Sequence, residues 1–123
     1  MFGKVHFLLL CTEVVGAFQG LLELAMGKET VRTSHCRTIL VAAAAGLVDD
    51  GGAVRRAARS LLVNLASTID QYSLITYMPT LSAHIGAAMT HTSSIVRIDT
   101  AETVAALAQV QPLAVSTATA LVR

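Results

Sequence analysis

Two histidines stand seven residues apart, at His84 and His91, and raise the question of metal binding or acid–base chemistry. Seven residues are two turns of an α-helix, so both side chains would lie on one helix face. A zinc site needs three or four ligands from Cys, His or carboxylate side chains. No such group stands three or four residues from either histidine. We therefore expect no metal site here, and an enzyme built on this pair is the weakest functional hypothesis.

A thiol follows an imidazole at His35-Cys36, but neighbouring side chains on a helix point apart, so adjacency alone makes no catalytic dyad. Gly51-Gly52 follows no strand and reads as a turn, not as a phosphate-binding loop. We predict no catalytic residue and no cofactor. Cys11 and Cys36 are expected to be buried free thiols, with a single disulfide between them as the alternative.

Three arginines gather in one stretch, at Arg55, Arg56 and Arg59. Together with Arg97 and His91 they are candidates for contact with RNA phosphate or with an acidic partner surface. The net charge of the chain is only +1, whereas a nucleic-acid-binding domain usually carries a clear basic excess. No aromatic residues lie between the arginines to stack on bases. The sequence therefore gives little support to direct contact with RNA.

Apolar residues make up 54% of the 123 residues and charged residues only 14%, whereas about a quarter of an average soluble domain is charged. The longest apolar run without a charge, 39–48, is far shorter than the roughly 20 residues of a membrane-spanning helix. The apolar start at 1–11 leads directly to Glu13 without a small-residue cleavage site, so we expect no signal peptide. The apolar surplus indicates faces that protein partners cover, and predicts that the isolated chain is poorly soluble or oligomeric.

Apolar residues recur every three or four positions along most of the chain, and no stretch alternates long enough to predict a strand. A polar connection is expected at 28–32, a loop at 49–52 and a connector at 70–76, with a short helical turn as the alternative for the last. The expected helices cover 12–26, 34–48 and 53–68, a fourth begins at Pro79, a fifth is capped by Thr92 or Ser93, and a sixth covers 113–123. The sequence thus predicts one all-α domain over 1–123. No stop signal follows the last helix, so either the domain continues or this copy is shortened.

The break after the fourth helix is marked by the string THTS at 90–93, whose side chains compete for backbone hydrogen bonds. Proline suits the first turn of a helix, which places helix starts at Pro79 and Pro112. We predict that Pro79, Met89, Thr90, His91 and Pro112 form the junctions between repeats. His91 would lie at the C-terminal end of its helix, where the helix dipole favours the charged form of the side chain. Partner contact is the alternative role for this corner.

An internal repeat of 42 residues relates VRRAARSLLVNLA, which starts at Val54, to VRIDTAETVAALA, which starts at Val96. This spacing lies within the period of about 40–47 residues of HEAT and armadillo repeats. It predicts an armadillo/HEAT-like α-solenoid of about three helix pairs, with a generic helical bundle as the alternative. Arg55 and Arg97 occupy the same place in the two copies. We expect an intramolecular ladder in which they bond a neighbouring loop or a carboxylate such as Asp50 or Asp99.

Several strings carry a resemblance to a known family. They are AHIGAAMTH at 83–91 with Pro79 at its entry, Gln111-Pro112 after the next helix, DDGGAVRRAARSLL at 49–62 and, more loosely, GLLEL at 20–24. Over residues 12–115 the chain resembles the N-terminal domain of the pre-rRNA-processing protein Ipi-one, called testis-expressed protein ten in animals. Asp99 and Glu102 stand where that family carries early acidic residues. The basic lead that often precedes the family's first repeat, and its C-terminal region, are missing here.

The resemblance implies a non-enzymatic, HEAT-like scaffold in the nucleus, within the nucleolus and nucleoplasm. In the family this scaffold joins a large α-helical protein and a WD-repeat propeller in a complex that binds the late precursor of the large (60S) ribosomal subunit. The complex works with an AAA-type ATPase and is needed to remove an internal transcribed spacer from pre-rRNA. The alternative is an unrelated HEAT or armadillo adaptor for protein–protein interaction in transport or signalling.

Overall fold

The computed structural model describes the backbone of residues 2–116 and the side chains of residues 12–116. Its elements are α1 (Phe2–Gly27), α2 (Glu29–Ala45), the short 3-10 helix η1 (Gly46–Val48), α3 (Gly52–Thr68), α4 (Gln71–Met89) and α5 (Ser94–Val110). Helical backbone resumes over 112–116, and no residue within 2–116 lies in a strand. The predicted all-α fold is confirmed. The predicted sixth helix and the single domain over 1–123 extend into 117–123, outside the described residues.

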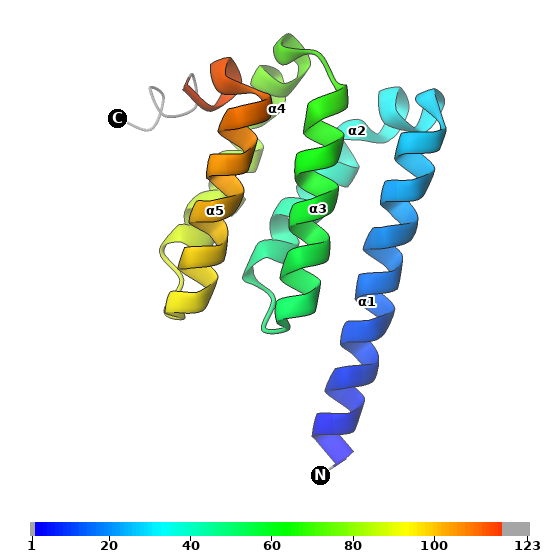
Figure 1. Cartoon of the computed structure of the whole chain (residues 1–123), viewed down its shortest axis with the longest axis vertical. Coiled ribbons are helices and arrows are strands. Elements are labelled where there is room, and N and C mark those ends of the chain that lie inside the picture. The colour runs from blue at the N-terminus through cyan, green and yellow to red at the C-terminus, as the bar shows by residue number, and fades with distance from the viewer. Residues whose placement is uncertain (1, 117–123) are drawn as a thin grey trace.

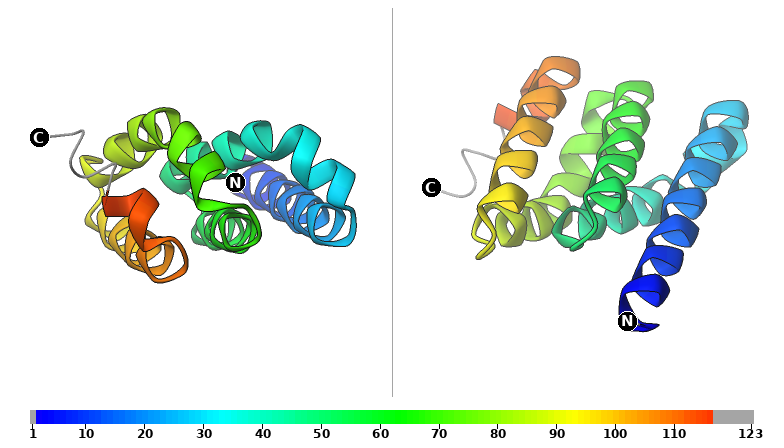
Figure 2. Two further views of the ribbon diagram at one scale, coloured as in Figure 1. Left: turned by 90° about the horizontal axis from the view of Figure 1, so that it is seen from above. Right: turned by 60° about the horizontal axis from the view of Figure 1, so that its bottom comes forward.

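The helices form two layers, in which α1, α3 and α5 lie side by side in front of α2 and α4 (Figures 1 and 2). Contacts join α1 to α3 and α3 to α5 within one layer, and α2 to α4 within the other. The described part of the chain therefore holds two complete helix pairs, α2–α3 and α4–α5, with α1 stacked before them. This is the stacking of a HEAT-like helical repeat, as the 42-residue period predicts.

Helix α3 is the centre of the stack, because it contacts α1, α2, η1 and α5. The closest approach is at Gly46, where a Cβ atom would lie only 2.9 Å from Cβ of Ala58 and 3.0 Å from Cζ of Phe18. A larger residue would push η1 away from both helices, so glycine is needed for this contact. The buried apolar side chains of α3 are Val54, Ala58, Leu61, Leu62, Leu65 and Ala66.

The predicted connection at 28–32 is wrong, since α2 begins at Glu29 and only Lys28 separates it from α1. The side chain of Arg32 explains why the turn is so short. Its Nη1 donates to the carbonyl oxygens of Ala25 and Met26, each at 2.9 Å. These carbonyls at the end of α1 have no partner within their own helix, and the arginine provides one.

The connection predicted at 70–76 and the helix start predicted at Pro79 are also wrong. Helix α4 begins at Gln71, because the carboxylate of Asp70 accepts a hydrogen bond from the backbone N–H of Ser73 at 3.0 Å and caps the helix. Pro79 therefore lies inside α4 and not at a repeat junction. The buried side chains of Leu74, Met78 and Leu81 continue across the proline. Their burial outweighs the one backbone hydrogen bond that proline removes.

Candidate interaction surface and repeat junctions

The loop that precedes α3 is closed by the guanidinium of Arg55. Its Nη1 donates to the carbonyl oxygens of Asp49 at 2.8 Å and Asp50 at 3.1 Å, and its Nε donates to Oδ2 of Asp99 at 2.9 Å. Only 9% of the residue is exposed. The expected intramolecular ladder is present, although Asp50 contributes its backbone oxygen and not its carboxylate. Arg55 is thereby used within the fold, which leaves no free surface at this side chain for RNA.

The loop that precedes α5 has the same arrangement. Nη1 of Arg97 donates to the carbonyl oxygens of His91 at 2.6 Å and Thr92 at 3.0 Å. These acceptors stand six and five residues before Arg97, as Asp49 and Asp50 stand before Arg55. The two junctions are thus equivalent at a spacing of 42 residues. Unlike Arg55, Arg97 is exposed.

The predicted corner lies at the turn between α4 and α5. Met89 is the last residue of α4 and Thr90 its C-cap, with Oγ1 of Thr90 donating to the carbonyl oxygen of Gly86 at 3.0 Å. Nδ1 of His91 accepts a hydrogen bond from the backbone N–H of Ser93 at 3.0 Å. This bond holds the imidazole of His91 against the turn that precedes α5.

The turn after α5 contains a contact that the sequence reasoning missed. Nε2 of Gln111 donates to the carbonyl oxygens of Ala66 at 3.0 Å and Ile69 at 2.9 Å, at the end of α3. It therefore joins the C-terminal end of α5 to the C-terminal end of α3. Pro112 follows and begins the helical backbone over 112–116. The sequence marks this turn by its Gln-Pro string, but nothing in the string indicates which carbonyl groups the side chain of Gln111 reaches.

Arg56 and Arg59 differ from Arg55 in their surroundings. Nη1 of Arg59 lies 3.2 Å from Oε2 of Glu102, and 39% and 58% of these side chains are exposed, so the pair adds little to stability. Arg56 is exposed and has no hydrogen-bond partner among the described residues. Of the three clustered arginines, Arg56 is therefore the one that is available to a partner.

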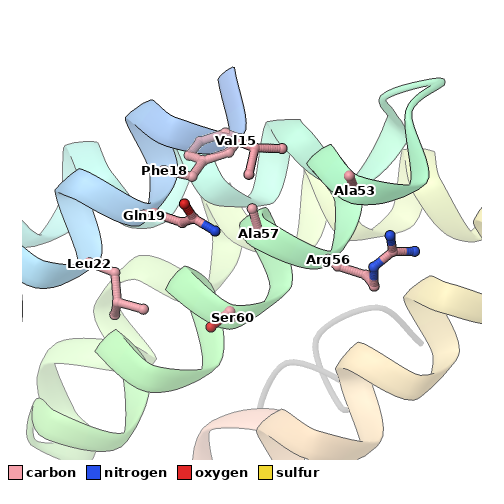
Figure 3. Close-up of a pocket in the computed structure, with 8 residues that line it drawn as sticks. All are labelled: Val15, Phe18, Gln19, Leu22, Ala53, Arg56, Ala57 and Ser60. Atoms are coloured by element: carbon pink, nitrogen blue, oxygen red, sulfur yellow. The ribbon is translucent and has the colours of Figure 1, made fainter. Parts of the chain in front are cut away.

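A hollow of about 310 Å³ opens beside Arg56, between α1 and α3. Figure 3 shows apolar side chains of α1 facing small residues of α3 across it, with Arg56 to one side. This is a surface that can accept an apolar side chain next to an acidic group. It is lined by Val15, Phe18, Gln19, Leu22, Ala53, Arg56, Ala57 and Ser60.

The two histidines considered for metal binding lie in different parts of the fold. His84 is a half-buried residue within α4, whereas His91 lies in the turn after it. Among the described residues no three metal-ligating side chains come together. Within the same part of the chain, no helix has the length and apolar character to span a bilayer.

Cys36 is a free thiol that is 4% exposed. Burial raises its pKa above the ordinary value, and the negative charge of Asp70 adds to the shift. A thiol with a raised pKa is a poor nucleophile, so Cys36 has the properties of a core residue. The side chain of Cys11 lies outside the described side chains.

No protein-family model matches the sequence, and no solved structure matches it. The sequence is 38% identical over 82 residues to a testis-expressed protein 10 homolog from the zebrafish Danio rerio. These residues are 67% of this chain but only 9% of the relative, so the match spans less than a tenth of the relative's length. The identity and the helical repeat agree with the resemblance carried by the strings at 49–62 and 83–91. The chain belongs to the family of testis-expressed protein ten and Ipi-one.

Proposed function

We propose that the chain is a non-catalytic scaffold subunit in the assembly of the large ribosomal subunit, needed for removal of an internal transcribed spacer and for late maturation. Family membership is the observation that carries the proposal. The helical repeat is compatible with a non-catalytic role, since stacked repeats present extended surfaces to partners. The proposed setting is the nucleus, with a large α-helical protein, a WD-repeat propeller and an AAA-type ATPase acting on the same precursor particle.

We propose the pocket between α1 and α3 as the site of partner contact. Its apolar lining provides the burial that interface energy requires, and Arg56 provides a free cation at the rim. Arg55 is unsuitable because its donors are used within the fold. An acidic segment of a protein partner with one bulky apolar side chain fits this surface. RNA is the weaker fit, because a single unpaired guanidinium offers little to a phosphate backbone.

Depletion and rescue test the proposal. Depletion of the chain in cells that express it is expected to raise the amount of spacer-containing precursor rRNA, measured by northern blot. Re-expressed wild-type chain and Arg37→Glu should restore processing, because Arg37 is exposed on α2, in the other layer. Arg56→Glu should fail to restore it. Unchanged precursor after depletion would instead favour an adaptor that acts in transport or signalling.

A further inference from the structure

Helix α5 carries the two aliphatic side chains that are most exposed in the described part of the chain. Ile95 is 60% exposed and Ile98 58%, and a spacing of three residues places them on one face of the helix. Glu102 follows four residues after Ile98 on the same face, and 58% of its side chain is exposed. The surface of α5 therefore presents a bulky apolar group directly beside a carboxylate.

The hollow between α1 and α3 has the opposite features. Apolar side chains of α1 line it, and the exposed guanidinium of Arg56 lies at its rim. Arg56 also lines a smaller hollow between α3 and α5, to which Glu102 contributes. The cation therefore lies between the larger hollow and α5. What α5 presents is thus what the hollow can accept, namely an apolar side chain next to an acidic group.

These two features lie at the same level of the stack. Ile98 and Glu102 stand 42 residues after Arg56 and Ser60, and both of these α3 residues line the hollow. Because α1, α3 and α5 lie side by side (Figures 1 and 2), the hollow and the side chains of α5 belong to one face of the molecule. Within one chain Ile98 cannot enter the hollow, since α3 lies between α5 and α1.

Two-fold symmetry would bring the two features together. In a two-fold dimer the same surface patch meets itself, so each contact occurs twice. An axis perpendicular to the face, between α3 and α5, would place Ile98 of each copy over the hollow of the other copy and Glu102 beside Arg56. The present pairing of Glu102 with Arg59 is exposed and weak, so it does not prevent Glu102 from reaching a second arginine.

We propose that two copies of this chain pair through this face, with Ile98 of each copy in the hollow of the other and Glu102 of each copy bonded to Arg56 of the other. The contact is small, so we expect a dissociation constant of about 10–100 µM. The dimer covers the hollow and Arg56, and therefore excludes any other protein from them. The proposal concerns the isolated chain and does not rest on the proposed function.

Sedimentation velocity tests the proposal on the full chain. Between about 1 and 200 µM, a range that brackets the expected dissociation constant, monomer should convert reversibly to dimer. Arg56→Glu and Glu102→Arg should each weaken the association at least about tenfold, because like charges then face each other. Arg37→Glu is the matched control and should leave the association unchanged, since Arg37 is exposed on α2 in the other layer. Circular dichroism checks that each variant is folded.

Mixing the two charge variants separates a contact between copies from an effect within one chain. In a dimer of one Arg56→Glu chain and one Glu102→Arg chain, both pairs again join opposite charges, so the mixture should recover the association that each variant lacks. Ile98→Ser should also weaken the dimer, whereas Tyr72→Ser, at a 71% exposed position of α4, should not. A chain that stays monomeric throughout the range would overturn the proposal and leave the hollow to a different protein. A dimer that the single charge variants leave intact, or a mixture that stays monomeric, would overturn it as well.

Discussion

Nε of Arg55 lies 2.9 Å from Oδ2 of Asp99, although the two residues are 44 positions apart in the sequence. The same guanidinium bonds the backbone of the loop before α3. One side chain therefore fixes the turn within a repeat and the contact between repeats. Because 37% of the Asp99 side chain is exposed, solvent screens the ion pair, and the bonds to the two loop carbonyl groups are the more protected part of the contact.

Replacement of Arg55 by Met should destabilise the fold by about 1–3 kcal/mol, because two loop carbonyl groups and the carboxylate of Asp99 lose the donors of a buried guanidinium. The neighbouring Arg56→Met is the matched control and should change the free energy of unfolding by less than about 0.5 kcal/mol, since Arg56 is exposed. Urea unfolding followed by circular dichroism measures both. Similar losses in the two variants would contradict the structural role assigned to Arg55.

Glycine should be required at Gly46 but not at Gly20. Gly46→Ala places a Cβ atom 2.9 Å from Ala58 and 3.0 Å from Phe18, which should cost about 1–3 kcal/mol by overpacking. At Gly20 an added Cβ meets nothing within 4 Å, so Gly20→Ala should stabilise helix α1 by about 0.5–1 kcal/mol. Thermal unfolding would show midpoint shifts of opposite sign, and a stabilised Gly46→Ala chain would refute the close contact.

The cap of α4 should depend on pH. Hydrogen bonds from the side chain and then the backbone N–H of Ser73 hold the pKa of Asp70 below its ordinary value. The folded pKa is thus below the unfolded one, so the stabilisation is fully present above about pH 4 and is lost as pH falls through the folded value. Wild-type chain should exceed Asp70→Ala in stability at pH 6. The gap should close toward pH 2, and a gap independent of pH would argue against the cap.

Cys36 should react slowly with a thiol reagent in the folded chain, because it is 4% exposed and its pKa is raised by burial. The measurement uses a Cys11→Ser chain, so that only one thiol is counted. After unfolding in urea, one equivalent of thiol per chain should react rapidly with the reagent. Ser34→Cys, at an exposed position of the same helix, provides the fast-reacting control. Equal rates at the two positions would place Cys36 on the surface.

The repeat and its arginines could be predicted from the sequence, because the Val-Arg pairs recur at 42 residues and each arginine bonds the loop that directly precedes its own helix. The first residue of α4 could not be predicted from the sequence. Proline suits a helix start, so the sequence predicts a connector at 70–76, but the Asp70–Ser73 cap starts the helix there, and the burial of Leu74 and Met78 extends it through Pro79. The bonds of Gln111 to α3 were also beyond reach, since they depend on how two repeats stack.

The most direct measurement of the proposed function is affinity purification of the tagged full chain from nuclear extract, with quantification of the rRNA that comes with it. Precursor rRNA that contains the internal transcribed spacer should be enriched relative to mature large-subunit rRNA and to a purification of Arg56→Glu. Recovery of neither the precursor nor the WD-repeat partner, from a chain that is folded by circular dichroism, would contradict the proposal.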